Sequence, residues 1–230
     1  KSSTIIENNY KPFKNKLVKY YEVNIHEHNK IIIHIEKMIQ EYKKLYIPTN
    51  SQRFGEKVYD FYKDKYNILL LDKNTEHIPC SSTWKNYDMV ICSPTVGAGI
   101  SCNDMFGKTI CYFSNNSCDA SLSAQQILRV RNTESDTIDI FICENFKQCL
   151  PTNSESIKEM IKTKYSLDVS FGLKVNRIED TIIENDYYKY FVEYIRSNNI
   201  SKIAFKRVLD GILINHGFST EDCDLEEEEE

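Results

Sequence analysis

Residues 89–101 read MVICSPTVGAGIS, and this stretch decides the fold class. Its first four residues form a short apolar run, which is typical of a buried strand. The next nine begin with the hydroxyls of Ser93 and Thr95. Gly97 and Gly99 follow, where the backbone can approach a ligand closely and point N–H groups at anionic oxygens. A tight turn is the alternative interpretation of the two glycines, but the adjoining hydroxyls favour a loop that binds phosphate.

Four further apolar runs along the chain predict strands. They cover residues 44–47, 67–71, 109–114 and 137–143. Helical patterns or loops separate the strands, so we expect an α/β fold with a mostly parallel sheet flanked by helices. In such sheets functional groups gather in the loops after the carboxyl ends of the strands. Loops rich in hydroxyl and amide groups occur at 48–53, 93–101 and 115–123.

Apolar residues at three- and four-residue spacing predict helices between the strands. Ser51 can cap a helix whose apolar face consists of Phe54, Val58, Phe61 and Tyr62. Further helices are expected within residues 1–43, at about 122–130, and in two amphipathic segments between 182 and 212. These helices would pack on the faces of the sheet.

The charge distribution divides the chain. Of the 34 acidic residues, eight lie in residues 219–230, which leaves 26 against 29 basic residues in the body. A mildly basic body suits contact with nucleic acid, whereas the acidic end is expected to be solvated. We expect four parts: a basic helical lead-in at 1–43, the α/β domain at 44–150, a helical appendage at 151–218 and a disordered acidic tail at 219–230.

The eight cysteines do not suggest a disulfide framework. Cys92, Cys111 and Cys143 lie inside apolar runs, where a free thiol behaves as a small core residue. No CxxC pair occurs, no histidine follows at zinc-ligand spacing, and no leader or run of about 18 apolar residues is present. We therefore expect no metal site, no membrane partner and an intracellular, reducing location.

The segment at 125–131, QQILRVR, places Gln125, Arg129 and Arg131 on the helix expected at 122–130. The two arginines lie two residues apart, so they cannot share one helical face. A surface helix with solvated charges is one interpretation. The other is that one arginine stabilises the charge on a γ-phosphate while its neighbour orients the helix or binds nucleic acid. The spacing does not decide which arginine would act on the phosphate.

Two further patterns have simpler explanations. The run FGKT at 106–109 is similar to the end of a P-loop, but Cys102 stands where that motif requires glycine, and the run leads into a strand. We therefore expect a plain loop there and no cradle for ATP phosphates in this chain. His26, His28 and His34 are expected on a solvated helix face rather than in a metal site.

Four tyrosines cluster near the C-terminal part of the chain. They are Tyr187, Tyr188, Tyr190 and Tyr194. Their spacing fits the core side of a helix, although exposed tyrosines could also stack on nucleic-acid bases. We expect them in a helix core.

The order and spacing of these segments resemble the second RecA-like domain of superfamily 2 helicases. The similar branch comprises viral replication-origin-binding helicases of large DNA viruses, and the resemblance covers residues 44–145. In that family a strand and hydroxyl-rich loop, here YIPTNS at 46–51, contacts the tracked DNA strand, which implies contacts from Thr49 and Ser51. The strand and loop at 88–101 resemble the next motif.

In that motif Ser93 stands at the position of a threonine that contacts the DNA backbone, and Thr95 would join it. The resemblance further implies nucleotide contacts at Gly97, Gly99 and Ser101. Ser101 occupies the position of the family's usual aspartate, which alters a ribose or inter-motif contact.

The resemblance also covers Gln125, Arg129 and Arg131, which match a motif that closes on ATP held by a partner domain. Here Leu128 replaces the family's glycine, and the arginines are closer together than usual. The resemblance thus implies catalytic roles for these three residues, with the arginine finger unassigned.

As a whole, the resemblance implies the second motor domain of an ATP-dependent DNA helicase that acts in viral DNA replication. ATP and Mg²⁺ would be bound mainly by a separate first RecA-like domain, in cis or in trans, so the chain alone should not hydrolyse ATP. Single-stranded or forked DNA is the expected partner, in the host cytoplasm or at a viral replication site. A non-catalytic docking module and an unrelated nucleotide-sugar transferase are the alternatives.

Overall fold

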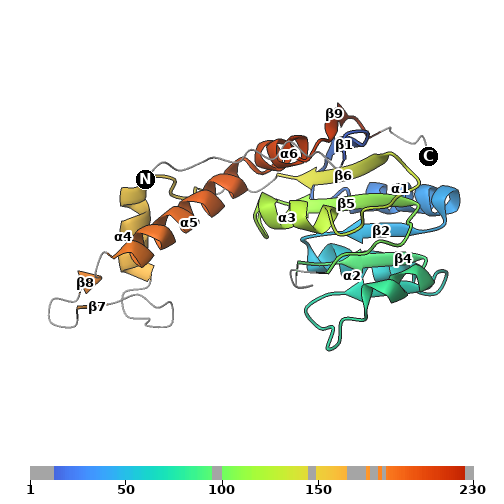
Figure 1. Ribbon diagram of the computed structural model, residues 1–230, viewed down its shortest axis with the longest axis horizontal. Coiled ribbons are helices and arrows are strands. Elements are labelled where there is room, and N and C mark those ends of the chain that lie inside the picture. Colours follow the sequence, from blue (N-terminus) through green and yellow to red (C-terminus); the bar gives the residue numbers. More distant parts are fainter. Residues whose placement is uncertain are drawn as a thin grey trace, which may run out of the picture. The chain divides into compact units, whose positions relative to one another are not determined.

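Seven strands form one sheet in the order β3-β4-β2-β5-β6-β1-β9, and every neighbouring pair is parallel (Figure 1). The computed structural model describes residues 13–94, 100–144, 149–164, 175–176, 181–182 and 185–225. The strands are β1 Leu17–Glu22, β2 Leu45–Pro48, β3 Ile68–Leu71, β4 Met89–Cys92, β5 Lys108–Ser114, β6 Thr137–Cys143 and β9 Ser219–Cys223. The predicted fold class, a parallel sheet flanked by helices, is confirmed.

Helices cover both faces of the sheet. Successive side chains of each strand point to opposite faces, so apolar residues on both faces need to be covered. In β2, Leu45 and Ile47 join the core beneath α1 (His28–Tyr42) and α2 (Gln52–Tyr62). Tyr46 faces the opposite side, which carries α3 (Ala120–Ile127) and the short 3₁₀ helix η1 (Ser81–Asn86) (Figure 1). Each face therefore has its own hydrophobic core.

The chain divides into two compact units, and the helical appendage is shorter than expected. One unit comprises Lys1–Phe146 and Lys206–Glu230, and the other comprises Lys147–Phe205. The second unit contains α4 (Ser154–Lys164), α5 (Asp186–Ile203) and an antiparallel pair of short strands, β7 (Val175–Asn176) and β8 (Thr181–Ile182). Helix α6 (Phe205–Asn215) belongs to the sheet unit from its second residue onward.

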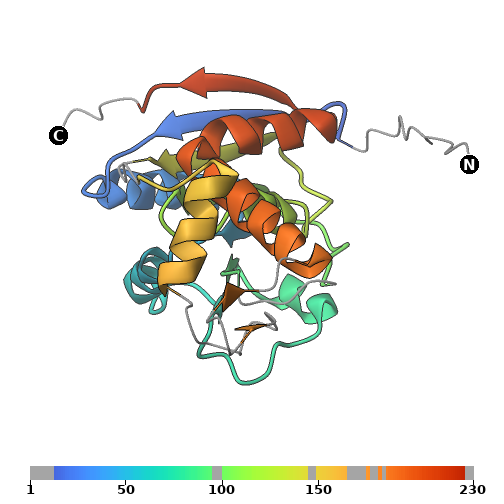
Figure 2. The ribbon, with the colours of Figure 1, turned by 90° about the vertical axis from the view of Figure 1, so that its left-hand side faces the viewer.

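Two strands of the seven-stranded sheet lie in segments where no strand was expected, as do the short β7 and β8 of the second unit. Strand β1 lies in the lead-in at 1–43, and β9 lies in the acidic tail at 219–230. Figure 2 shows them side by side, although they come from opposite ends of the sequence. The acids of β9 are neutralised in place, since Asp222 lies 2.7 Å from Lys206 Nζ and Glu221 lies 3.6 Å from Lys19 Nζ. Pairing with β1 and these ion pairs order a segment whose composition favours disorder.

Helix α2 begins where the sequence predicted. The Ser51 hydroxyl accepts a hydrogen bond from the Phe54 N–H at 3.3 Å, and Val58 and Tyr62 are buried. Phe61, which was predicted on the apolar face, is instead 56% exposed. Tyr62 takes the position against the core, and its hydroxyl donates to the Ile32 carbonyl at 2.6 Å.

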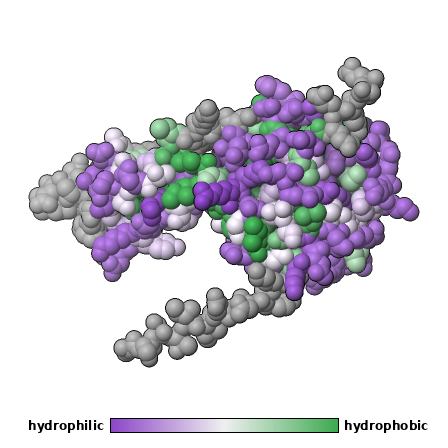
Figure 3. All heavy atoms as spheres, turned by 90° about the horizontal axis from the view of Figure 1, so that it is seen from above, coloured by the Kyte–Doolittle hydropathy of each residue, from purple (hydrophilic) through white to green (hydrophobic). Residues whose placement is uncertain are grey.

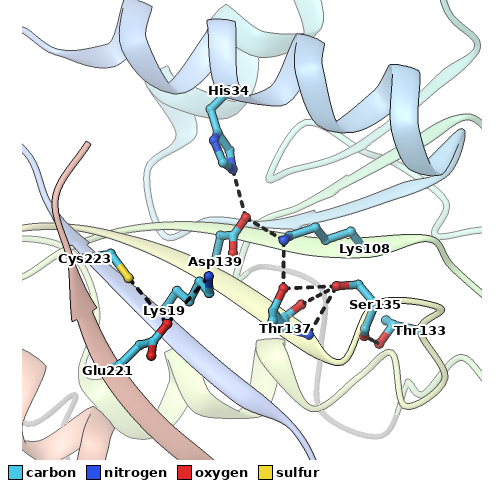
Figure 4. Close-up of polar contacts among 9 residues, drawn as sticks. All are labelled: Lys19, His34, Lys108, Thr133, Ser135, Thr137, Asp139, Glu221 and Cys223. Carbon is cyan, nitrogen blue, oxygen red and sulfur yellow. Dashed lines mark hydrogen bonds and ion pairs between the residues drawn. The ribbon is translucent and has the colours of Figure 1, made fainter. Parts of the chain in front are cut away.

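A buried ion cluster lies between the sheet and α1 (Figure 4). Lys108 Nζ and His34 Nε2 lie 3.0 and 2.8 Å from the same carboxylate oxygen of Asp139, a residue that is 1% exposed. Lys108 Nζ also donates to the Thr137 hydroxyl at 2.8 Å. Lys108 is therefore held in the core of the sheet, and the prediction that FGKT is no P-loop but the entry to a strand is confirmed.

The expectation of a solvated histidine face is wrong for two of the three histidines. His28 is buried, with its Nε2 2.8 Å from the Tyr112 hydroxyl, and His34 pairs with Asp139. Only His26 is exposed. Both corrected residues point from α1 toward the sheet, where a histidine can serve as a polar core residue.

The tyrosines of α5 divide between core and surface. Tyr188 is buried with Val192 against Ile157 and Ile161 of α4. The expectation of a helix core is wrong for the others, since Tyr187, Tyr190 and Tyr194 are 49, 70 and 53% exposed. The second unit is small, so its single core buries only one side of α5.

The surface and the thiols agree with a chain that keeps its apolar groups inside. All eight cysteines are free, and Cys92, Cys111 and Cys143 are buried, as predicted. The face seen in Figure 3 is mainly hydrophilic, with a few hydrophobic areas. Among the described residues, no helix is both long and apolar enough to cross a membrane.

Candidate nucleic-acid and nucleotide interface

The three loops singled out in the sequence follow strands that are neighbours in the sheet. These strands are β4, β2 and β5, in that spatial order. Because all three are parallel, their carboxyl ends lie at one edge of the sheet, and Pro48 is directly opposite Cys92 there. Thr49, Ser93 and Asn115 therefore begin adjacent loops. The arrangement brings hydroxyl and amide groups from distant segments to one edge.

Thr49 and Ser51 both shape the turn between β2 and α2. Thr49 is 1% exposed, and its hydroxyl accepts a hydrogen bond from the Ser51 N–H at 3.1 Å. Its own N–H donates to the Cys92 carbonyl at 2.9 Å, which extends the pairing of β2 with β4. The Ser51 hydroxyl caps α2. The cap at Ser51 was predicted, whereas sequence reasoning missed the structural role of Thr49, and Ser51 is the more accessible of the two.

Asn50 was not singled out by the sequence, yet it ties two of the loops together. Its amide nitrogen donates to the Ser114 carbonyl at 2.9 Å, and its amide oxygen accepts from the Ser114 N–H at 2.7 Å. The side chain is 3% exposed and pairs with β5 as a strand residue would. The only signal in the sequence was an amide within a hydroxyl-rich loop.

The loop after β4 is anchored at both ends. Ser93 is 6% exposed, and its N–H donates to the Leu71 carbonyl at 2.9 Å. At the far end, Ser101 is exposed, and its carbonyl accepts from the Ser81 hydroxyl of η1 at 2.7 Å. Three residues expected to contact DNA or nucleotide lie outside the described residues: Thr95, Gly97 and Gly99.

Helix α3 ends earlier than predicted, so the two arginines are not on it. The helix begins at the Asp119 cap, whose carboxylate accepts from the Leu122 N–H at 2.9 Å, and it ends at Ile127. Leu128 and Arg129 then form a turn, in which the Arg129 N–H donates to the Gln126 carbonyl at 3.2 Å, and Val130 forms a parallel bridge with Cys102. Pairing with Cys102 thus replaces the last helical turn and fixes Arg129 and Arg131 beside the end of the loop after β4.

The structure separates Gln125, Arg129 and Arg131 by exposure. Arg129 is 7% exposed, and its Nη1 donates to the Ile100 carbonyl at 3.5 Å. Gln125 and Arg131 are exposed. Gln126 is 1% exposed, and neither of its amide atoms has a hydrogen-bond partner among the described residues. Arg129 is therefore built into the domain, whereas Arg131 is available to a ligand.

The positive charge of Arg129 acts on the groups beneath it. Burial raises the pKa of the Cys92 thiol to about 11, and the nearby Arg129 charge opposes that rise. Burial also raises the pKa of Tyr46, again with Arg129 acting in the opposite direction. The Tyr46 hydroxyl donates to the Gln126 carbonyl at 2.9 Å and so fixes the end of α3 on the sheet. Tyr46 and Arg129 together position the segment that carries Arg131.

A metal-binding cluster is not present in the part of the chain that the structure describes, where no three His, Cys, Asp or Glu side chains converge. The side chains that remain at the edge are hydroxyls, amides and the Arg131 guanidinium. Such groups bind phosphate oxygens as hydrogen-bond donors. These are donor groups of the kind that the sequence analysis expected at a phosphate-binding edge.

Comparison with known proteins gives a viral relative and two structural likenesses, while no family model matches the chain. The sequence is 28% identical over 191 residues to a protein of African swine fever virus (isolate Pig/Kenya/KEN-50/1950) named "Putative helicase/primase complex protein". That alignment covers 74% of this chain and 18% of the relative, so the chain matches less than a fifth of the viral protein.

Solved structures are similar at low identity. The yeast DEAD-box splicing factor Prp28 has a TM-score of 0.47 and 10% identity, over 80% of this chain and 39% of that one. The T4 UvsW structure has a TM-score of 0.42 and 12% identity, over 93% of this chain and 42% of that one.

Proposed function

We propose that this chain is the second RecA-like domain of a superfamily 2 DNA helicase of the viral origin-binding type. The observation that carries the proposal is the juxtaposition of the loops after β4, β2 and β5 at one sheet edge, with the exposed Arg131 beside them. The similarity to a viral protein named for a helicase/primase complex supports it. The proposed enzyme would be larger than this chain, because the alignment spans 18% of that relative.

The sheet edge would grip the backbone of one DNA strand. Ser93 lies at the start of the loop after β4 and Ser51 at the end of the loop after β2, with Thr49 holding the turn and Thr95 completing the proposed contact. Hydroxyl and N–H donors bind phosphate oxygens without reading bases. The binding of single-stranded or forked DNA should therefore be insensitive to sequence.

Arg131 would be the arginine finger, and Arg129 would position it. A finger must reach a γ-phosphate held by another domain, which an exposed guanidinium can do and a 7% exposed one cannot without rearrangement. Arg129 holds the Ile100 carbonyl and so fixes the segment on which Arg131 lies. Gln125, exposed at the end of α3, would join the nucleotide contact together with the loop at Gly97, Gly99 and Ser101.

ATP and Mg²⁺ would be held mainly by a first motor domain. The residues of this chain fit a contact to bound nucleotide rather than a phosphate cradle, because Lys108 is paired with the buried Asp139. When bound, ATP with Mg²⁺ supplies the phosphoryl group whose charge Arg131 would stabilise. This chain would therefore contribute the surface that closes over ATP bound to the first motor domain.

A docking module without catalytic function is the second candidate. It is favoured by the burial of Arg129 and by Leu128 and Ser101, which stand where the helicase family has glycine and aspartate. The two candidates differ in whether Arg131 affects ATP hydrolysis.

The test is DNA-stimulated ATP hydrolysis by a full-length protein that carries both motor domains. Removing an arginine finger lowers kcat by about 10³- to 10⁵-fold, so Arg131→Ala should lose nearly all activity. The control Lys85→Ala, which removes an exposed lysine just before β4, should retain it. Unchanged hydrolysis in both Arg131→Ala and Arg129→Ala would favour the docking module.

A further inference from the structure

A cationic and aromatic stripe runs along the outer side of α2. Arg53, Lys57 and Phe61 follow one another at four-residue spacing, so they form one ridge on the helix. Arg53 and Lys57 are exposed, and the Phe61 ring is 56% exposed. We call these three residues the α2 stripe. None of them belongs to the loops on which the proposed function rests.

The two cations of the α2 stripe are not neutralised by the protein. Over the described ranges, Arg53 has no ion pair, and Lys57 Nζ has only the amide oxygen of Asn29 at 2.9 Å. Glu56 lies between the two cations and accepts a hydrogen bond from the neutral amide of Gln52 at 2.6 Å, and Asp60, one turn further on, pairs with Lys63 at 2.8 Å. Among the described residues neither acid forms an ion pair with Arg53 or Lys57, so both cations can bind an external anion.

The buried histidine next to α2 lies within reach of both cations of the α2 stripe. His28 lies beside the N-terminal part of α2, with its ring edge-on to Phe54. Burial is the main cause that lowers the pKa of His28, and the charges of Lys57 and Arg53 lower it further. A ligand that neutralises Arg53 and Lys57 should therefore be sensed at His28.

The space around Phe61 can hold a flat ring. A surface hollow of about 550 Å³ is lined by Arg53, Lys57 and Phe61 together with Glu56 and Asp60. A second hollow of about 460 Å³ lies on the other side of Phe61, between α1 and α2. The aromatic ring stands between two open spaces, and Lys65 Nζ lies 5.8 Å from its centroid.

We propose that the α2 stripe binds single-stranded nucleic acid, with phosphates on Arg53 and Lys57 and a base stacked on Phe61. The stripe is about 12 Å long, since eight residues rise about 1.5 Å each, which is long enough to contact more than one nucleotide. It begins two residues after Ser51, so it continues the sheet-edge track along the helix. Cations for the backbone and an aromatic ring for the base are the groups that bind single strands without sequence preference.

The test is the binding of fluorescently labelled oligo-dT to the 230-residue chain, measured by anisotropy across a salt titration. Arg53→Ala/Lys57→Ala should weaken binding about tenfold or more and reduce the slope of log K against log salt by about 1.4, because single strands contribute about 0.7 per neutralised phosphate. The matched control Lys14→Ala/Lys85→Ala removes two exposed lysines that precede β1 and β4, and should bind as wild type.

Phe61 is tested by two substitutions. Phe61→Ala should weaken binding about tenfold, in line with the loss of one stacked base, with an unchanged salt slope. Phe61→Leu keeps an apolar side chain without a ring, and it should bind as weakly as Phe61→Ala. A Phe61→Leu variant that binds as wild type would overturn the stacking contact and indicate an apolar partner instead.

His28 supplies a second readout that does not depend on affinity. Phosphates on Arg53 and Lys57 would offset the charges that lower the pKa of His28, so saturating oligonucleotide should raise that pKa in an NMR titration. An unchanged His28 titration, or a double variant that binds like its control, would overturn the proposal, as would a wild-type chain that binds no oligonucleotide. If Ser93→Ala/Arg131→Ala loses binding while Arg53→Ala/Lys57→Ala binds as wild type, the sheet edge binds DNA and the α2 stripe does not.

Discussion

At the scale of single residues, Gly107 shows how closely the start of β5 approaches the end of α1. Its N–H donates to the Lys44 carbonyl at 2.8 Å. A Cβ added at Gly107 would lie 2.8 Å from that same oxygen and would collide with the carbonyl oxygen of Tyr42. Backbone atoms cannot yield as a flexible side chain can, so only glycine fits.

Gly107→Ala should therefore lower the free energy of unfolding by about 3 kcal/mol, the upper part of the usual range for overpacking. Urea denaturation followed by circular dichroism measures this value. Gly211→Ala is the matched control, since a Cβ there meets no atom within 4 Å and lies inside α6. Alanine should be neutral or stabilising at Gly211. Equal stability of both variants would contradict the packing at Gly107.

His28 predicts how stability depends on pH. Burial and neighbouring cations lower its pKa in the folded state below the ordinary value of 6.5. The unfolded chain then binds the proton more tightly, so the contribution of His28 to stability is present above pH 6.5 and is lost as the pH falls toward the folded pKa. His28→Gln should reduce the loss of stability in this pH range, measured by denaturation at a series of pH values. The exposed His26→Gln should not, and an identical pH profile for both variants would contradict this role of His28.

At the scale of elements, β9 depends on its neighbours more than on its own sequence. It pairs with β1 on one side only and carries three acids in or beside the strand. Lys206 of α6 reaches both Glu22 of β1 and Asp222 of β9, at 2.8 and 2.7 Å. This lysine links the helix to the two strands.

Lys206→Met should loosen β9 and leave the centre of the sheet intact. Without the lysine, Asp222 and Glu22 lose their shared cation, and the edge strand should open more often. Hydrogen exchange followed by mass spectrometry should show faster exchange at Ser219–Cys223 and unchanged exchange in β2 and β4. Equally fast exchange in all strands, or no change in β9, would contradict the local role of Lys206.

These elements show which parts of the fold sequence patterns can predict. Strands β2, β4, β5 and β6 are apolar runs that are buried almost throughout, and each was found within one residue. Strand β3 was expected to be covered on both faces, yet three of its four residues are only half-buried because it is an edge strand. Strand β9 has no apolar pattern, since its order comes from pairing and ion pairs distant in sequence.

The sequence predicted those features of the candidate site that depend on neighbouring residues and on the fold class. Parallel strands brought the predicted loops together as expected, because that follows from the fold class. Asn50 and Arg129 bond to partners 64 and 29 residues away, respectively. Thr49 is buried because the turn after β2 lies inside the domain. No spacing rule reveals such contacts. The choice between Arg129 and Arg131 became possible only once their exposures were known.

At the scale of the whole molecule, the proposed function makes this chain half of a motor. The sheet unit has hydroxyl and amide groups at one edge, and the lysine of its P-loop-like run pairs with the buried Asp139. In the proposed helicase, the complementary half would hold ATP and Arg131 would connect the two. A helicase needs that connection for every step along DNA, whereas a docking module does not.

The measurement that tests this most directly is ATP-driven unwinding of a forked DNA duplex by a full-length protein with both motor domains. The account predicts that Arg131→Ala abolishes strand separation while Lys85→Ala unwinds at the wild-type rate. DNA binding without ATP should survive in Arg131→Ala, since the sheet-edge hydroxyls remain. Unwinding by Arg131→Ala at the wild-type rate would contradict the account.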